Sequence, residues 1–180
     1  MPGRLLKRGV VLLAVALMLA LGIEFTQVLR TAPALAAPGE QATRVVVEKA
    51  VRRLTLERDG VVLARYAIAL GADPVGHKQQ EGDGRTPEGT YAVDFKHPRS
   101  RYHLALRISY PDARAQETAR PAGVSPGSDI MIHGIRNGLG WLGALHRERD
   151  WTDGCVAVTN AEIREIWARV PHGTPVEIRP

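Results

Sequence analysis

The sequence predicts a single, mainly β domain: a β-sandwich with a few short helices packed on it. The 180-residue chain contains 18 Gly and 12 Pro, which favours short strands joined by turns over a helical bundle. Several segments alternate polar and apolar residues with a period of two, as half-buried strands do. Once an N-terminal targeting segment is subtracted, the remaining length supports one hydrophobic core rather than two.

The first half of the expected domain consists of strands and one long loop. Residues 44–57 contain two alternating segments, and Asp59-Gly60 is a turn signal that predicts a β-hairpin over 54–70. Residues 71–88 are rich in Gly, Asp, Pro and charged side chains, a composition typical of a long functional loop. Further strands are expected at 90–95 and 104–110, with one short helical turn within 111–120.

The second half is expected to end in a helix and a strand. A helix is predicted from a cap at Thr159 or Asn160 as far as Val170, because its apolar residues recur on one side and Pro171 and Gly173 follow. Strands are expected at 129–133, 155–158 and 175–178, with a glycine-rich loop at 137–143.

The N-terminus has the layout of an export signal. A basic start precedes an apolar run at 10–23, and Ala34-Leu35-Ala36 forms a small-x-small site before a proline. We expect a signal peptide or an uncleaved N-terminal signal anchor at 1–37, a linker at 38–43 and a catalytic domain at 44–180. Either form of the leader places the domain outside the cytoplasm, in the periplasm or cell envelope and in the second case anchored in the inner membrane.

The net charge of +5 does not indicate nucleic-acid binding. Part of it lies in the leader, which carries four basic residues against one acidic residue. The basic residues that follow are scattered among acidic ones, without the clustered basic face of a nucleic-acid-binding protein. The scattered charges instead indicate an ordinary solvated surface of mixed sign.

Cys155 is the only cysteine, so it cannot form a disulfide within the chain. A lone cysteine is often a small buried apolar residue, but the neighbours of Cys155 favour chemistry. A nucleophilic thiol needs a base within reach, and His133 at a strand end can face Cys155 across a sheet. Gly154 permits an unusual turn, and the main-chain N–H groups of Gly154 and Cys155 are candidates to bind an oxyanion.

Three segments together resemble a known family. His133-Gly134, followed after a loop by Thr152-Asp153-Gly154-Cys155, resembles the active-site motif of the L,D-transpeptidases of the YkuD fold. The upstream segment Arg85-Thr-Pro-Glu-Gly-Thr-Tyr91 is similar to the Thr-Pro-x-Gly signature of that family. The resemblance covers roughly residues 44–180 and implies a YkuD-type β-sandwich.

The resemblance also implies a mechanism. Cys155 would attack a peptidoglycan stem tetrapeptide at the L-centre of its diamino acid, expel the terminal D-alanine and form a thioester. An amine of a second stem peptide, or water, would resolve that thioester. His133 would be the base, oriented by the main-chain carbonyl of Gly134. No metal and no cofactor is implied, and a zinc site built from His133, His146 and Cys155 is disfavoured because no close ligand pair is present.

Two positions depart from the pattern of the family. Most members have His where this chain has Asp153, and Arg or Asn where it has Ala157. The Asp153 carboxylate would raise the pKa of the thiol if it pointed at it, and we expect it to face the opposite side of the strand. The Thr-Asp-Gly-Cys form resembles a subgroup that includes hydrolases of protein–peptidoglycan links.

Four further residues are candidates for substrate binding: Arg85, Thr152, Asp153 and Trp141. Three functions therefore compete. The first is an L,D-transpeptidase in cell-wall cross-linking or remodelling, and the second is an L,D-carboxypeptidase or endopeptidase that transfers the acyl group to water. The third is a catalytically silent wall-binding module. The sequence leaves the oligomeric state open.

Overall fold

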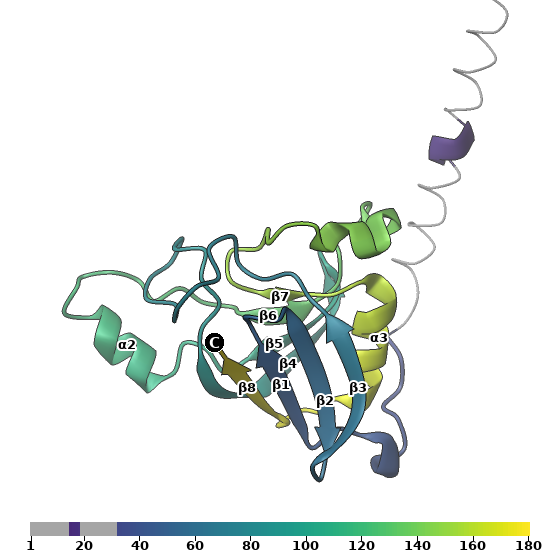
Figure 1. Cartoon of the computed structure of the whole chain (residues 1–180), viewed down its shortest axis with the longest axis horizontal. Coiled ribbons are helices and arrows are strands. Elements are labelled where there is room, and N and C mark those ends of the chain that lie inside the picture. Colours follow the sequence, from purple (N-terminus) through teal and green to yellow (C-terminus); the bar gives the residue numbers. More distant parts are fainter. Residues whose placement is uncertain (1–14, 19–31) are drawn as a thin grey trace, which may run out of the picture.

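The computed structural model describes residues 15–18 and 32–180 of the chain (Figure 1). The leader predicted for residues 1–37 therefore lies largely outside the described residues. Within the described part, no helix is both long and apolar enough to cross a membrane.

In the described part of the chain, eight strands follow one another in a single hydrogen-bonded order, β3-β2-β1-β8-β4-β5-β6-β7. The long strand β4 joins two halves of the sheet, β3-β2-β1-β8 and β5-β6-β7. Its first residues pair with β8 and its later residues pair with β5. The strands are β1 (Arg44–Glu48), β2 (Arg53–Arg58), β3 (Val61–Ala67), β4 (Gly89–Ser100), β5 (His103–Ile108), β6 (Met131–His133), β7 (Val156–Ala157) and β8 (Pro175–Arg179).

Both halves of the sheet bury their apolar faces in one core. Leu54 and Leu56 of β2, Leu104 and Leu106 of β5, and Ile132 of β6 belong to the same cluster of buried side chains. Burial of each such side chain contributes about 1.5–3 kcal/mol to folding. The mainly β fold with a few short helices, expected from the sequence, is confirmed.

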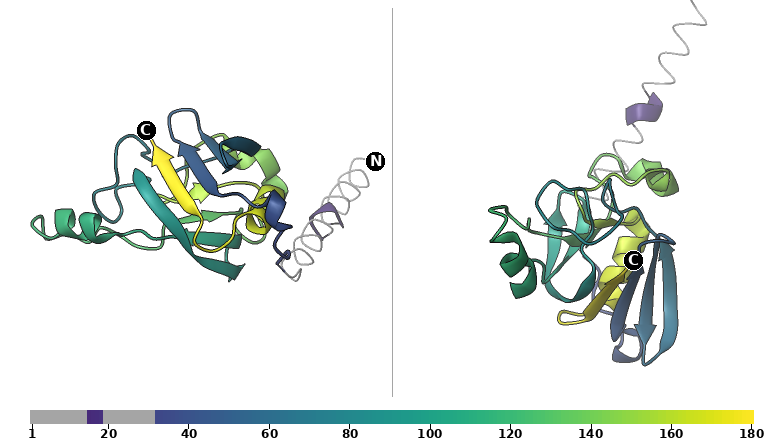
Figure 2. Two further views of the ribbon diagram at one scale, coloured as in Figure 1. Left: turned by 90° about the horizontal axis from the view of Figure 1, so that it is seen from below. Right: turned by 60° about the vertical axis from the view of Figure 1, so that its left-hand side comes forward.

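Helix α3 (Asn160–Arg169) covers this core where the two halves of the sheet meet (Figures 1 and 2). Thr159 is its N-cap and forms a capping box with Glu162, so the helix begins where the sequence predicts. Ile163 and Ile166 are fully buried in the core cluster. The short helix α2 (Ala113–Ala119) projects away from the sheet at the opposite side of the molecule (Figure 1).

The segment expected to be a linker is held against α3. It forms the short 3-10 helix η1 (Pro38–Glu40), after which the N–H of Ala42 donates to the carbonyl of Arg169 at 2.7 Å. Upstream, the indole N–H of Trp167 donates to the carbonyl of Pro33 at 3.1 Å. These contacts attach the start of the domain to its C-terminal helix.

Most predicted elements are present, and two differ for identifiable reasons. Strand β4 continues beyond the predicted end at residue 95, because its pairing with β5 shifts between His97 and Ser100 and this irregularity accommodates Pro98. The glycine-rich segment at 137–143 is only partly a loop, since the 3-10 helix η2 (Gly140–Arg147) begins within it and is kinked at Gly143.

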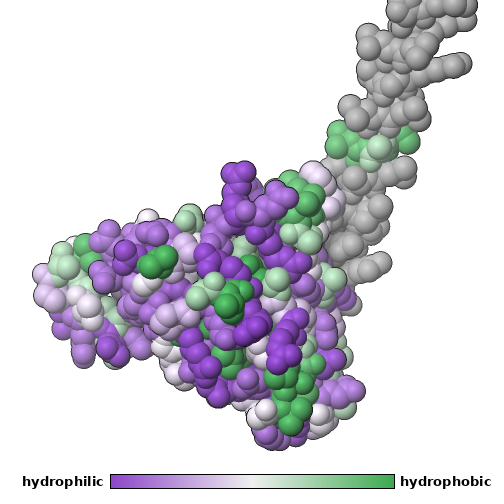
Figure 3. Space-filling view, viewed as in Figure 1, coloured by the Kyte–Doolittle hydropathy of each residue, from purple (hydrophilic) through white to green (hydrophobic). Residues whose placement is uncertain are grey.

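The surface agrees with the mixed character expected from the scattered charges. On the face seen in Figure 3, hydrophilic residues predominate and hydrophobic residues occur as small separate groups. Ion pairs join side chains of neighbouring strands, for example Arg53 of β2 with Glu48 of β1 at 2.8 Å.

Candidate active site

His133 is the last residue of β6, and Cys155 immediately precedes β7, the parallel strand next to β6. In the register of β6 and β7, Ile132 is paired with Val156 and His133 with Ala157, so Cys155 immediately precedes the paired segment. Both side chains line one open cavity of about 500 Å³. The sheet therefore brings together two residues that lie 22 positions apart in the sequence.

A hydrogen bond fixes the orientation of the His133 ring. Its Nδ1 lies 2.6 Å from the carbonyl oxygen of Gly134, and because a carbonyl only accepts, Nδ1 must carry the proton. The Nε2 atom is then left as the basic nitrogen. Burial lowers the pKa of His133 to about 4, although the bond to Gly134 acts in the opposite direction. The imidazole is thus neutral near pH 7 and able to accept a proton.

Gly134 is required where it lies. A Cβ atom at this position would come within 2.7 Å of the side-chain oxygen of Asn160 and 3.0 Å of Ile163. The N–H of Gly134 donates to the carbonyls of Tyr102 and Leu104, at 3.1 and 3.2 Å. Gly134 therefore orients His133 through its carbonyl, while its own N–H is not available to an oxyanion.

The Cys155 thiol is protonated in this state. Burial raises its pKa to about 11, and the carboxylates of Asp153 and Asp129 also raise it, while the N–H of Met131 and the charge of Lys78 act to lower it. The thiol donates a long hydrogen bond of 3.7 Å to the carbonyl of Asp129. A neutral thiol and a neutral imidazole on one cavity suit general-base activation rather than a preformed ion pair.

The expectation that Asp153 faces away from the thiol is wrong. Asp153 lines the same cavity as Cys155, and its charge raises the pKa of the thiol. The physical reason is spacing: on a strand only adjacent residues face opposite sides, whereas residues two apart face the same side. Gly154 between them also has φ of +127°, so the backbone turns sharply here.

The turn that carries Cys155 is closed by Thr152. The Thr152 hydroxyl donates to the carbonyl of Cys155 at 2.8 Å and accepts from the N–H of Gly154 at 3.2 Å. Because the N–H of Gly154 is engaged in this bond, it is not free to bind an oxyanion as the sequence suggested. Thr152 lines the cavity but is buried, with its hydroxyl committed to the turn.

The main chain of the long loop at 71–88 packs against the same turn. A Cβ atom on Gly154 would lie 2.5 Å from the carbonyl oxygen of Arg85, so only glycine fits. The N–H of Ala72 donates to the carbonyl of Thr152 at 3.0 Å. Nearby, the fully buried Thr86 accepts the N–H of Gly71 at 3.2 Å. The Thr-Pro-x-Gly segment therefore acts as a scaffold for the nucleophile turn.

A buried lysine and a partly buried aspartate hold this loop in place. Lys78 is only 3% exposed, and its Nζ donates to Asp83 at 2.8 Å and, at 3.5 Å, to the carbonyl of Asp153. Burial acts to raise the pKa of Asp83, but hydrogen bonds from Lys78 and from three main-chain N–H groups lower it to about 2. The loop is therefore fixed against the nucleophile turn, because Lys78 binds both Asp83 within the loop and the carbonyl of Asp153.

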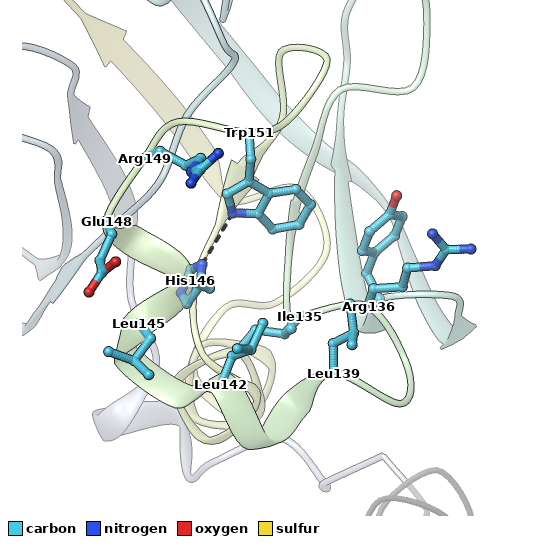
Figure 4. A pocket seen from close by; sticks show the side chains of 10 residues that line it. Ile135, Arg136, Leu139, Leu142, Leu145, His146, Glu148, Arg149 and Trp151 are labelled. Atoms are coloured by element: carbon cyan, nitrogen blue, oxygen red, sulfur yellow. Dashed lines mark hydrogen bonds between the residues drawn. The ribbon is translucent and has the colours of Figure 1, made fainter.

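Two aromatic rings lie close to the buried His133. The Tyr102 ring lies 4.5 Å from the imidazole between centroids, and the Trp151 ring lies 5.8 Å from it. Trp151 also borders an adjoining apolar cavity of about 580 Å³, where its Nε1 donates to His146 at 3.4 Å (Figure 4). Leu139, Leu142 and Leu145 form the opposite wall of that cavity (Figure 4).

Two of the predicted substrate-binding residues lie elsewhere. Neither Arg85 nor Trp141 is among the residues that line the cavity of Cys155. Arg85 contacts the site through its main chain, and Trp141 is 63% exposed on η2. The aromatic residues that do border the site are Tyr102 and Trp151, and no motif in the sequence distinguishes Tyr102 as a site residue.

Replacing the Thr152 hydroxyl should destabilise the nucleophile turn. Thr152→Val removes both hydrogen bonds in a buried setting, so the free energy of unfolding should fall by about 1–3 kcal/mol. Denaturant unfolding measures this loss, with Thr118→Val as the control because the Thr118 hydroxyl is exposed and bonds to the carbonyl of Arg114 in its own helix. Equal stability of the two variants would contradict the role given to Thr152.

Comparison with known proteins identifies the class to which this fold and site belong. The YkuD family, described as the L,D-transpeptidase catalytic domain, matches residues 42–178. The chain therefore belongs to the YkuD family of L,D-transpeptidase catalytic domains, as the motifs around His133 and Cys155 indicate.

This chain spans only part of the length of each relative that it matches. The chain is 32% identical over 108 residues to the Escherichia coli K12 protein named "Putative L,D-transpeptidase YafK". This match covers 59% of this chain and 36% of that protein. The helical cell shape determining protein Pgp2 of Campylobacter jejuni superposes with a TM-score of 0.55 at 24% identity, over 76% of this chain and 46% of Pgp2. An L,D-transpeptidase of Mycobacterium smegmatis superposes with a TM-score of 0.52 at 15% identity, over 76% and 58%. The solved structures of Pgp2 and of the Mycobacterium smegmatis enzyme thus share the fold of this chain.

Proposed function

We propose that the protein is an exported cysteine acyltransferase, an L,D-transpeptidase that acts on peptidoglycan stem tetrapeptides through a thioester on Cys155. The observation that carries this proposal is the neutral pair of Cys155 and His133 on one cavity, with Nδ1 of His133 bound to the Gly134 carbonyl. Membership of the YkuD family supports the same chemistry. The basic and apolar N-terminal pattern supports export.

The first half of the proposed reaction forms the thioester. The thiol turns from the Asp129 carbonyl toward Nε2 of His133, which accepts its proton as the sulfur attacks the carbonyl carbon at the L-centre of the diamino acid. The main-chain N–H of Cys155 is the proposed donor to the oxyanion, since those of Gly154 and Gly134 are engaged. The C–N bond then breaks, and the imidazolium returns its proton to the departing amine of D-alanine.

The second half resolves the thioester. The neutral His133 accepts a proton from an incoming nucleophile, which attacks the thioester carbonyl and releases the thiolate, and the imidazolium returns the proton to that sulfur. An amine of a second stem peptide gives a cross-link, whereas water gives a shortened peptide. The same catalytic pair therefore serves a transferase or a hydrolase, depending on whether an amine or water attacks the thioester.

Intact-protein mass spectrometry tests the proposal directly. The soluble domain and its Cys155→Ala variant are incubated with disaccharide-tetrapeptide and, separately, with a carbapenem that can acylate the thiol. We expect a covalent adduct on the wild-type protein only, followed by a cross-linked dimer. A tripeptide without a dimer would indicate a carboxypeptidase. A folded wild-type domain that forms neither adduct nor product would contradict the enzyme and favour a silent wall-binding module.

A further inference from the structure

The cavity of Cys155 is lined by charged groups of opposite sign from different segments of the chain. Arg99 and Arg101 line it from the end of β4 and the turn into β5, whereas Asp153 lines it from the nucleophile turn. All three residues are exposed, and no ion pair joins any of them to another residue in the described part of the chain. These charges are therefore available to a ligand.

Asp129 also lines the cavity, but it has a partner already. Its carboxylate lies 3.6 Å from the guanidinium of Arg107, which also binds Asp94 at 2.9 Å. Asp129 is thus partly neutralised, and Asp153 is the carboxylate in the cavity whose charge is free.

The position at which the family pattern has Arg or Asn is unable to bind an anion in this chain. Ala157 has no polar side-chain atom, is fully buried and forms a bridge with Ala69. A substrate carboxylate that enters the cavity must therefore be bound from another wall. Guanidinium groups suit this purpose, because they bind carboxylates through two parallel hydrogen bonds.

The proposed substrate carries the complementary pair of charges. When a diamino acid is joined to the stem through its L-centre, the far end of its side chain bears a free ammonium group and a free carboxylate. These two charges sit on one carbon, so a site that binds both needs a cationic and an anionic wall with the ligand between them. The lining of the Cys155 cavity contains both kinds of charge.

Resting on the function proposed above, we infer that Arg99 and Arg101 bind the side-chain carboxylate of the diamino acid and that Asp153 binds its ammonium group. This arrangement gives Asp153 a use that offsets its unfavourable effect on the thiol. It also makes the enzyme selective for stem peptides whose diamino acid ends in an amino-carboxylate.

The test compares rates of thioester formation with two stem tetrapeptides, one with a free side-chain carboxylate and one in which this carboxylate is amidated. The wild-type protein should react about 10- to 100-fold faster with the free form, as expected for the loss of hydrogen bonds to a charged group. The double variant Arg99→Gln/Arg101→Gln should lose this preference. Arg114→Gln is the control, because Arg114 is exposed and lines a different cavity beside α2.

The ratio of the two rates is the readout, since it cancels any general effect on the thiol. Asp153→Asn should lower the preference for a free over an acetylated side-chain amine in the same way, even though it also removes a charge that raises the pKa of Cys155. Equal rates with free and amidated peptides in the wild type, or a preference that survives in the double arginine variant, would overturn the inference. Failure of the wild type to react with either peptide, while iodoacetamide still labels Cys155, would instead remove the proposed function and the inference with it.

Discussion

Replacing His133 with glutamine should lower the rate of thioester formation at pH 7 by about 10²–10⁴-fold, the usual contribution of a general base. Without the imidazole, the reaction depends on the small fraction of Cys155 that is ionised, because burial raises the pKa of the thiol to about 11. The rate of the variant should therefore rise about tenfold for each pH unit between 7 and 10.

The wild-type enzyme should show a different pH profile. Burial lowers the pKa of His133 to about 4, so its Nε2 is basic at every pH above this value and protonated below it. The rate should be flat near neutrality and fall as the pH drops through about 4. His172→Gln is the matched control, because the exposed His172 bonds to the carbonyl of Asp94 and does not line the cavity. A folded His133→Gln variant with the wild-type profile would contradict the role of His133 as base.

Gly154→Ala should destabilise the domain by at least about 2 kcal/mol and abolish thioester formation. The new Cβ would lie 2.5 Å from the carbonyl oxygen of Arg85, a main-chain atom that a side-chain rotation cannot move away. In addition, φ of +127° is strained for any residue with a side chain. The turn must shift to relieve both, and Cys155 moves with it. Thermal unfolding and mass spectrometry of the adduct measure the two effects.

Gly173→Ala separates the steric effect from the backbone effect. Gly173 also has a positive φ, of +84°, but no atom of the described residues lies within 4 Å of its ideal Cβ position. It is exposed after α3 and lies outside the catalytic cavity. This variant should lose about 1 kcal/mol of stability and keep its reactivity. If Gly154→Ala behaved like Gly173→Ala, the close contact with Arg85 would not be important.

The mainly β fold and the order of its elements could be predicted from the sequence, because these depend on local patterns. Asp59-Gly60 determines the hairpin of β2 and β3, since both residues adopt the positive φ values that a tight turn needs. The capping box of Thr159 and Glu162 likewise marks the start of α3 with residues three apart. The candidate pair of Cys155 and His133 could also be named, because each lies in a short motif beside a glycine.

Only the tertiary structure decided what each side chain contacts. Arg85 was expected to bind substrate, but its carbonyl packs against Gly154, a contact between residues that lie 69 positions apart. Asp153 was expected to face away from the thiol, and the turn at Gly154 instead places both on one cavity. Tyr102 belongs to the site because β5 pairs with β6, which places the turn before β5 beside His133. Local patterns specify strands, helices and turns because they act between neighbours in the chain, whereas the register of distant strands determines which side chains share a cavity.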